Sequence, residues 1–261
     1  MQGLLSAAEA PLIAKDYFSD RSALYAAFRP TYPESLFDFV ASLPSRRHLA
    51  LDVGTGNGQA AIGLAQRFDH VVAIDGSSEQ LQHAIAQPNI DYRHAPAEQS
   101  GLAVNSADLV TAAQALHWFD IDAFFGEARR VLVPGGVIAV WGYGDPWLEE
   151  PSLQSAVHAF NRGTLEPYWA PERALLLDGY RTIEFPFEEI VTPSFSLEQR
   201  WTLEQLTGLM RTWSATSRFA ARHGRDPSVE VETALRAEWG DPKTLRAVRW
   251  PLYLRAGRTS G

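Results

Sequence analysis

The segment LALDVGTGNGQ over residues 49–59 constrains the fold of this chain more than any other stretch. Its short apolar run ends in an acid, Asp52, and continues into a turn that contains Gly54, Gly56 and Gly58. The apolar run predicts a buried parallel strand, and glycines let the backbone approach a ligand closely at the carboxyl end of that strand. Because open α/β sheets hold nucleotide-like cofactors at a turn that opens a helix, we expect a cofactor site here.

The spacing of the glycines bears on which cofactor the turn accepts. A dinucleotide fingerprint reads G-x-G-x-x-G/A, but here the third position falls on Gln59 and Gly58 comes one residue early. The next apolar run, VVAID, ends at Asp75, 23 residues after Asp52, which suits a carboxylate that accepts hydrogen bonds from ribose hydroxyls. Sites for NAD and for S-adenosylmethionine both use such an acid, so only the glycine spacing argues against NAD.

Four motifs of the first half occur in the order and spacing of the class I S-adenosylmethionine-dependent methyltransferases, which the chain resembles most strongly over residues 15–145. They are LDVGTGNG (51–58), VVAIDGS (71–77), PAEQSGLAVNSADLV (96–110) and RVLVPGGVIAV (130–140). YAAFRPTYP (25–33) and AQALHWFD (113–120) resemble the small-molecule branch, methyltransferase type 11, that includes the trans-aconitate methyltransferases. The resemblance implies methyl transfer from S-adenosylmethionine to a small organic molecule.

Composition argues against several other classes of protein. The 261 residues carry 31 acidic and 23 basic side chains, a net charge of −8, and no basic run is longer than two residues. A surface that binds polyanions normally shows a basic stripe, so we expect no nucleic-acid partner. The chain has no cysteine, which excludes disulfides and thiolate metal sites, and its histidines are scattered, so we expect no metal site.

Hydropathy predicts neither a membrane span nor a secretory signal. No uninterrupted apolar stretch approaches the roughly 20 residues of a membrane-spanning helix. The N-terminal segment lacks an early positive charge, and Glu9 and Pro11 interrupt its apolar residues, unlike a signal peptide. We therefore expect a cytoplasmic protein without a membrane partner, and the sequence leaves open whether it is a monomer or a homodimer.

Short apolar runs alternate with helical stretches after residue 35, which predicts βαβ units and a parallel sheet. We expect strands near 49–53, 70–75, 90–94, 108–113 and 136–142, and helices near 34–42, 57–67, 78–86, 121–132, 203–222 and 229–239. The final run, 245–258, has the pattern of a further strand, and in the resembled family the closing strands are antiparallel. The predicted fold is a Rossmann-like α/β class I methyltransferase sheet, mostly parallel, with a closing antiparallel strand.

The chain is predicted to divide into three parts of one fold. Residues 1–33 form an N-terminal flap, and residues 34–145 form the Rossmann-like core that binds S-adenosylmethionine. Beyond Gly144 aromatic residues become dense and prolines interrupt the pattern. Residues 146–261 therefore supply the closing strands and a partly helical substrate cap over the active site.

The parts of S-adenosylmethionine call for different partners. Backbone amides of Gly54, Thr55 and Gly56 can approach the amino-acid tail, and Asp52 can receive its ammonium directly or through water. Asp75 is expected to accept from the ribose hydroxyls, with Gly76 and Ser77 alongside. For Asp52 alone, a helix-capping role is the alternative.

The adenine and the cofactor carboxylate have further candidate partners. The resemblance places Ala97 and Glu98 beside the adenine, although a polar residue that the family often carries two places before the acid is replaced by Pro96. Proline offers neither a side-chain acceptor nor an amide donor, so we expect other groups to bind the adenine amino group. Arg29 is a candidate partner of the cofactor carboxylate, or else a surface arginine, and Gln114 completes the predicted cofactor set.

The segment after the fourth predicted strand, Gln114 to Phe119, is expected near the transferable methyl group. Amino-group methyltransferases that act on bases commonly carry an Asn/Asp-Pro-Pro-aromatic tetrad there, and its absence argues against an adenine or glutamine amino acceptor. A carboxylate acceptor is already ionised and needs no general base, whereas a phenol, hydroxyl or carbon acceptor does. His117 is the candidate catalytic base or positioning residue, with a structural role as its alternative, and Trp118 is a pocket wall or a core residue.

The cap offers an arginine beside aromatic residues, Arg211 with Trp213. Such a pair suits an acid with an apolar body, because a guanidinium binds a carboxylate bidentately, and a helix-surface ion pair is the alternative.

Aromatic side chains from both ends of the chain are predicted to enclose the substrate. Trp147, Tyr168 and Trp169 resemble a hydrophobic lid, and Tyr25 and Tyr32 close the other side from the flap. Core packing is the alternative for at least one of the lid residues.

Together these features predict O-methylation of a carboxylate on a small molecule. The alternatives are O- or N-methylation of a phenolic, quinone-like or heterocyclic metabolite with His117 as base, a non-catalytic protein that binds the adenosyl cofactor, and, more distantly, an NAD-dependent oxidoreductase.

Overall fold

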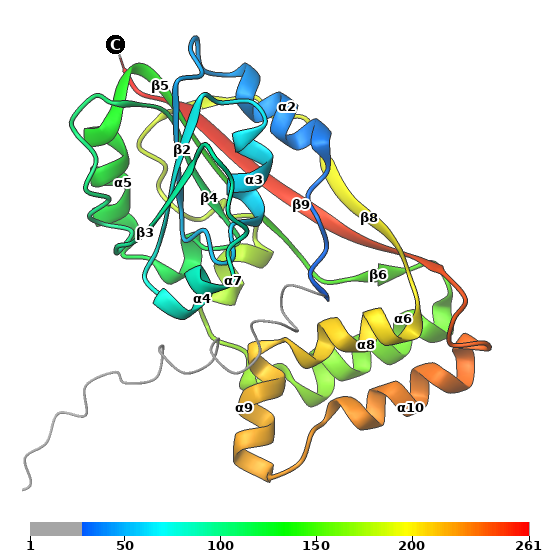
Figure 1. Cartoon of the computed structure of the whole chain (residues 1–261). Coiled ribbons are helices and arrows are strands. Elements are labelled where there is room, and N and C mark those ends of the chain that lie inside the picture. The colour runs from blue at the N-terminus through cyan, green and yellow to red at the C-terminus, as the bar shows by residue number, and fades with distance from the viewer. Residues whose placement is uncertain (1–27, 261) are drawn as a thin grey trace, which may run out of the picture.

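The computed structural model describes residues 28–260 and has one long sheet at its centre (Figure 1). The strand order along the sheet is β3-β2-β1-β4-β5-β9. The first five of these are parallel, and β9 runs antiparallel to β5. Their bounds are Leu49–Val53 for β1, His70–Asp75 for β2, Ile90–His94 for β3, Ala107–Ala113 for β4, Leu132–Tyr143 for β5 and Arg246–Arg258 for β9.

Three shorter strands pair with β9 in the antiparallel direction. They are β6 (Trp147–Leu148), β7 (Glu188–Ile190) and β8 (Phe195–Trp201). The sheet therefore changes from parallel to antiparallel at β9. This confirms the predicted fold class, a Rossmann-like, mostly parallel α/β sheet closed by an antiparallel strand.

Each face of the parallel sheet has its own apolar core, because successive strand residues point to opposite faces. On β4, Leu109 packs with the side chains of α2 and α3, whereas Val110 packs with those of α5 and α7. Figure 1 shows α3 and α5 on opposite sides of the sheet. The bounds of these helices, with the short α4 that follows β2, are Glu34–Ser42 for α2, Gln59–Ala65 for α3, Ser78–Gln82 for α4, Ile121–Val131 for α5 and Arg173–Leu177 for α7.

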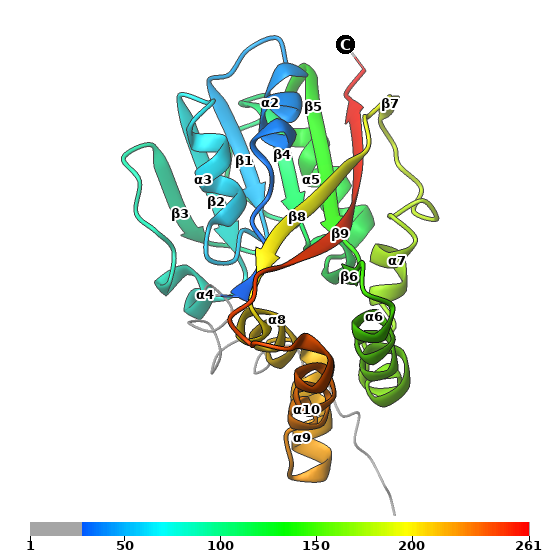
Figure 2. The same cartoon turned by 90° about the vertical axis from the view of Figure 1, so that its right-hand side faces the viewer.

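A layer of helices lies beyond one end of the sheet, as Figures 1 and 2 show. It contains α6 (Pro151–His158), α8 (Leu203–Arg211), α9 (Ser214–His223) and α10 (Ser228–Trp239). A π-helical turn (Ala159–Thr164) and a 3-10 turn (Glu166–Tyr168) continue the chain after α6. Buried leucines of these helices belong to the same continuous core as one face of the sheet, so sheet and cap are packed together.

Most predicted elements are confirmed, and their boundaries differ where side chains or glycines intervene. The helix expected over 203–222 is two helices, α8 and α9. Thr212 between them and Thr216 in the first turn of α9 donate from their hydroxyls to the carbonyls of Leu209 and Met210 at 2.6 and 2.7 Å, and Trp213 is extended. These hydroxyls occupy carbonyls at the end of α8 that a continuous helix would use, which separates the two helices.

Glycines account for two further differences. α3 begins at Gln59 rather than at 57, because Gly58, its N-cap, has a left-handed φ of 87°. β5 begins at Leu132 rather than at 136, so that Pro134, Gly135 and Gly136 lie inside the strand. There Gly135 has a φ of 73°, and the pairing of β4 with β5 shifts register between Ala107 and Leu109. The glycines therefore form an irregularity within the strand.

Gly63 on α3 provides a test of the packing between α2 and α3. A Cβ at this position would lie 2.3 to 2.6 Å from ring atoms of Phe37, whose ring is held edge-on against Tyr32 and Trp141. We expect Gly63→Ala to lower the free energy of unfolding by about 1–3 kcal/mol through overpacking. Urea unfolding with an unchanged slope measures this loss.

Gly126 on α5 is the matched control, since a Cβ there would meet no atom within 4 Å. Gly126→Ala is expected to stabilise the protein by about 0.4–1 kcal/mol, because alanine restricts the unfolded chain. Equal effects of the two substitutions would contradict this account of the helix contact.

Candidate functional site

The glycine turn after β1 has a backbone that only glycine adopts without strain. Gly54, Gly56 and Gly58 have φ values of 67°, 58° and 87°. A Cβ at Gly54 would come within 2.6 Å of Cβ of Ala115, and one at Gly58 within 2.2 Å of the Tyr92 hydroxyl. The turn is therefore fixed by its neighbours as well as by its own conformation.

Asp52 lies beneath this turn and is completely enclosed. Its two oxygens accept hydrogen bonds from the hydroxyls of Thr55, at 2.6 Å, and Thr111, at 2.7 Å. Burial raises the pKa of Asp52 to about 6, against the lowering effect of these hydrogen bonds. A direct contact with a ligand ammonium, one of the two arrangements predicted from the sequence, is not open to this side chain in the structure.

Asp75 at the end of β2 faces the same turn and stays partly exposed. Its Oδ2 accepts from the amide of Gly56 at 2.7 Å, and its Oδ1 from the amide of Ser77 at 2.8 Å. Burial raises the pKa of this carboxyl, whereas the two amides lower it. Because a Cβ at Gly76 would meet no atom within 4 Å, the space beside Asp75 is open.

The residues expected beside an adenine follow β3. Ala97 is buried, and Glu98 accepts from the amide of Asp120 at 3.2 Å. Asp120 in turn caps α5, since its side chain accepts from the amide of Ala123 at 3.2 Å. Ser77 likewise caps α4, accepting from the amide of Gln80 at 3.4 Å.

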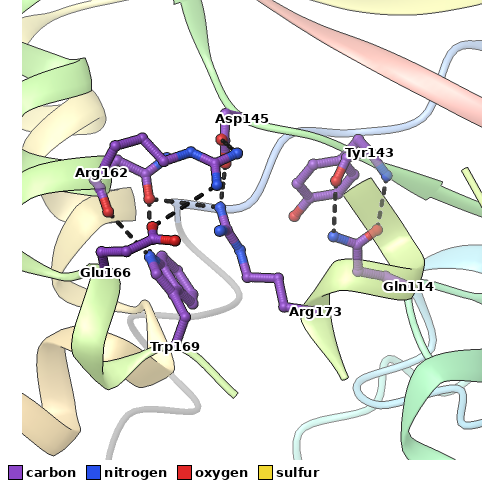
Figure 3. Close-up of polar contacts among 8 residues, drawn as sticks. Gln114, Tyr143, Asp145, Arg162, Glu166, Trp169 and Arg173 are labelled. Carbon is purple, nitrogen blue, oxygen red and sulfur yellow. Dashed lines mark hydrogen bonds and ion pairs between the residues drawn. The ribbon is translucent and has the colours of Figure 1, made fainter. Parts of the chain in front are cut away.

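Gln114 directly follows β4 and continues its pairing with β5 through its side chain. Its backbone is left-handed, with a φ of 58°. Its amide group donates to the Tyr143 carbonyl at 3.2 Å and accepts from the Tyr143 amide at 2.7 Å (Figure 3). The hydroxyl of Tyr143 accepts from Arg29 at 2.8 Å. Arg29 is thereby attached to the carboxyl end of β5.

A cavity lies between the carboxyl ends of β4 and β5 and the cap. The predicted residues that line it are Arg29, Gln114, His117, Trp118, Trp169 and Trp213. Tyr143, Asp145 and Arg173 line it as well, and sequence reasoning did not select them. The structure thus brings candidate cofactor residues and candidate substrate residues to one cavity.

His117 is a buried member of the cavity wall. Its Nδ1 lies 3.0 Å from the hydroxyl of Tyr180. The centroid of its ring is 4.8 Å from that of Trp118, a side chain that is 46% exposed. Burial, assisted by the positive charge of Arg173, lowers the pKa of His117 to about 4. The imidazole is therefore neutral at physiological pH and is a weak base.

Arg211, predicted to bind a substrate carboxylate, is directed to α10 instead. It forms an ion pair with Glu232 and donates to the hydroxyl of Ser228 at 3.2 Å, and it is not among the described residues that line the cavity. The helix-surface ion pair given as the alternative is therefore the arrangement observed.

Three of the predicted aromatic contacts also lie away from the cavity lining. Tyr32 is buried in the core, Trp147 is 44% exposed on β6 next to Arg249, and Tyr168 hydrogen-bonds His223 at 2.5 Å. Another predicted aromatic contact, Tyr25, falls outside the described residues. The aromatic walls of the cavity come instead from the tryptophans of the cap and of the segment after β4.

Arg173 is the most prominent residue that sequence reasoning missed. Its guanidinium carbon lies 3.8 Å from the centroid of the Trp169 ring, and it forms an ion pair with Asp145 (Figure 3). The available signal was weak: an arginine four residues after a tryptophan in a segment interrupted by prolines. Within residues 28–260 no cluster of His, Cys, Asp or Glu could hold a metal ion, and no helix could cross a membrane.

Comparisons with known proteins all identify relatives that are named as methyltransferases. The family that matches residues 51–140 is described as a methyltransferase domain. A Dictyostelium discoideum protein named a "putative methyltransferase" is 33% identical over 246 residues, which cover 92% of this chain and 93% of that protein. A Saccharomyces cerevisiae protein named a "probable S-adenosylmethionine-dependent methyltransferase" is 26% identical over 80% of this chain and 84% of its own length.

A solved structure is similar over nearly the whole chain. It is described as a "putative type II methyltransferase" from Anaeromyxobacter dehalogenans, and it is 42% identical with a TM-score of 0.83. The match covers 90% of this chain and 100% of that one.

The buried charge of Asp52 leads to a stability prediction. Its pKa of about 6 in the folded state exceeds the unfolded value of 3.8, so this carboxyl lowers the stability of the folded state as pH rises from about 4 to 6, and the loss is complete above pH 6. We expect Asp52→Asn to raise the free energy of unfolding by up to about 3 kcal/mol at pH values above 6, because the amide removes the buried charge. The gain should shrink between about pH 6 and pH 4, where the native carboxyl is protonated.

Chemical denaturation at several pH values checks this dependence, with the exposed Asp122→Asn as the matched control. Loss of stability in Asp52→Asn at every pH would show that the two threonines need the carboxylate itself.

Proposed function

Because the chain belongs to the class I S-adenosylmethionine-dependent methyltransferases, we propose that it transfers a methyl group to the carboxylate of a small organic molecule. The observation that carries the proposal is the composition of the cavity wall. Two guanidinium groups, of Arg29 and Arg173, lie there with a histidine whose lowered pKa makes it a poor base. Such a wall suits an acceptor that is already an anion.

The residues beside the glycine turn fit an adenosyl cofactor. Of the roughly four lone-pair positions of the Asp75 carboxylate, the amides of Gly56 and Ser77 use two, which leaves two for ribose hydroxyls. The open space at Gly76 gives the ribose access to this edge. S-adenosylmethionine, when bound, supplies a methyl group on a positively charged sulfur that is a good leaving group.

Further contacts follow from the positions of the other candidate residues. Arg29 would pair with the cofactor carboxylate. Gln114 would fix the backbone of Tyr143, with which its side chain pairs, beside the methyl group of the cofactor. Ala97 and Glu98, between β3 and α5, would flank the adenine. Asp52 would not contact the cofactor directly, but its hydrogen bond with Thr55 would hold the glycine turn in position.

The acceptor would be aligned rather than activated. An in-line displacement needs the attacking oxygen, the methyl carbon and the sulfur in one line, with water excluded. Trp169 and Trp213, whose ring centroids are 5.6 Å apart, supply an apolar wall that excludes water. No proton has to move when the nucleophile is a carboxylate, so no residue of the cavity needs to act as a base.

A phenolic or heterocyclic acceptor is the second candidate, favoured by the contact of His117 with Tyr180. This contact fixes the orientation of the imidazole at the cavity wall. A base with a pKa of about 4, however, removes a proton from a phenol inefficiently at neutral pH.

Asp75→Ala tests the cofactor site. We expect it to weaken binding of S-adenosylhomocysteine by about 10- to 100-fold, because the ribose loses hydrogen bonds to a charged acceptor. Calorimetry measures the affinity, with Asp122→Ala as the control and NADH as a second ligand. Unchanged affinity, or tighter binding of NADH than of S-adenosylhomocysteine, would contradict the assignment.

The pH dependence of turnover tests the acceptor class. For a carboxylate acceptor we expect kcat/KM to be level from about pH 6 to pH 9, since the acid and His117 both keep their charge state in that range. His117→Gln should then retain most of the activity. Products are identified as methyl esters by mass and by their loss on mild alkaline hydrolysis.

A rise in kcat/KM with a histidine-like midpoint, abolished by His117→Gln, would instead support the base-assisted reaction. In that case phenols or heterocycles should be turned over in preference to acids.

A further inference from the structure

We propose that Arg173, stacked on Trp169 and anchored by Asp145, binds the carboxylate of the acceptor and so selects anionic substrates. The proposal rests on the proposed methyl transfer to a carboxylate and names the residue that recognises that group. It assigns Arg173 a specificity-determining role in the cavity.

The ring of Trp169 fixes the plane of the guanidinium. Its Nε1 donates to the backbone oxygen and to Oδ1 of Asn161 at 3.2 and 3.0 Å. Asn161 is only 2% exposed, so the indole is attached to a buried partner. The Arg173 guanidinium carbon lies 3.8 Å from the ring centroid, a distance at which a cation is attracted to the face of the ring.

The hydrogen bonds of Arg173 leave one side of the guanidinium available. Nη2 donates to Asp145 and lies 3.5 Å from Oδ1 of Asn161. Nε and Nη1 have no hydrogen-bond partner within residues 28–260, and neither atom is among the fully enclosed ones without a partner. The side chain is 13% exposed and lines the cavity. Nη1, on the edge of the guanidinium opposite to Nε–H, can therefore donate to a carboxylate oxygen in the cavity.

The distribution of charge favours an anion at this position. Asp145 is shared, because Arg162 also pairs with it at 2.9 Å, and Glu166 lies 3.8 Å from Arg162 on the more exposed side (Figure 3). Among residues 28–260, the charged side chains that line the cavity are those of Arg29 and Arg173, which are positive, and Asp145, which is negative. An acceptor carboxylate would balance this excess.

Arg173 also lies at the end of the sheet where methyl transfer is proposed. Its charge acts on His117, which follows β4. Arg29 donates to the Tyr143 hydroxyl, and the carbonyl of Pro30 next to it accepts from Gln59, which directly follows the glycine turn. The two arginines are therefore suited to different carboxylates, that of the cofactor and that of the acceptor.

Binding of paired probes to the full chain saturated with S-adenosylhomocysteine tests the proposal. The probes are phenylacetate with phenylacetamide and hexanoate with hexanamide, which match in shape and differ in charge. Calorimetry should show that the wild type prefers at least one acid to its amide by about 10- to 100-fold. Arg173→Gln should abolish this preference without changing the affinity for the amide, and Arg173→Lys, which keeps the charge without the planar guanidinium, should retain part of it.

Arg162→Gln is the matched control, because Arg162 also pairs with Asp145 but does not line the cavity. It should keep the acid preference. The proposal is overturned if the wild type binds neither acid more tightly than its amide, or if Arg173→Gln keeps the preference. Unchanged affinity for S-adenosylhomocysteine in each variant shows that the fold is intact, and Arg173→Lys serves if Arg173→Gln does not fold.

Turnover separates this proposal from the proposed function. If the acids bind through Arg173 but only phenols or heterocycles are methylated, the anion site stands and carboxylate methylation is wrong. If methyl esters form and Arg173→Gln discriminates acids from amides as the wild type does, carboxylate methylation stands and the assignment of Arg173 is wrong.

Discussion

The buried carboxylate of Asp52 is the constraint on which the rest of the cofactor side depends. It joins the turn to β4 through the hydroxyls of Thr55 and Thr111, and the Asp75 carboxylate joins the turn to β2 through the amide of Gly56. Two acids, one enclosed and one partly open, thus hold a backbone that contains three left-handed glycines. The raised pKa of Asp52 shows that burying this charge costs stability, as is common where a fold maintains a binding site.

The cap depends on this same end of the sheet, because its helices share one apolar core with the face beneath α2 and α3. β9 supplies part of that core, since its Trp250 packs edge-on against Trp201 of β8 and also lines the cavity. The wall of the cavity is consequently part of the packed interior. Trp213 and Trp250 are buried in that core, so that a substrate that packs against them has fewer side chains to order, which lowers the entropic cost of binding.

The sequence predicted those features that depend on short spacings along the chain. The glycine turn and Asp75 are local, and they lie where the pattern indicated. Which arginine lines the cavity does not depend on short spacings along the chain. Arg211 and Arg173 each lie close to a tryptophan in sequence, but Glu232 on α10 binds the first, whereas Asp145 at the end of β5 draws the second to the cavity. These contacts span 21 and 28 residues and depend on helix packing, which periodicity does not reveal.

A guanidinium that binds an attacking carboxylate must not consume the lone pair that reacts. Each carboxylate oxygen has two lone pairs, so a hydrogen bond from Nη1 to one oxygen leaves the other oxygen free to attack the methyl carbon. Two further features limit how strongly Arg173 withdraws charge from that oxygen: its charge is shared with Asp145, and its face is covered by Trp169. A neutral His117 adds no second cation beside the nucleophile. This wall therefore orients an anion while leaving it reactive, which is what displacement at a sulfonium methyl requires.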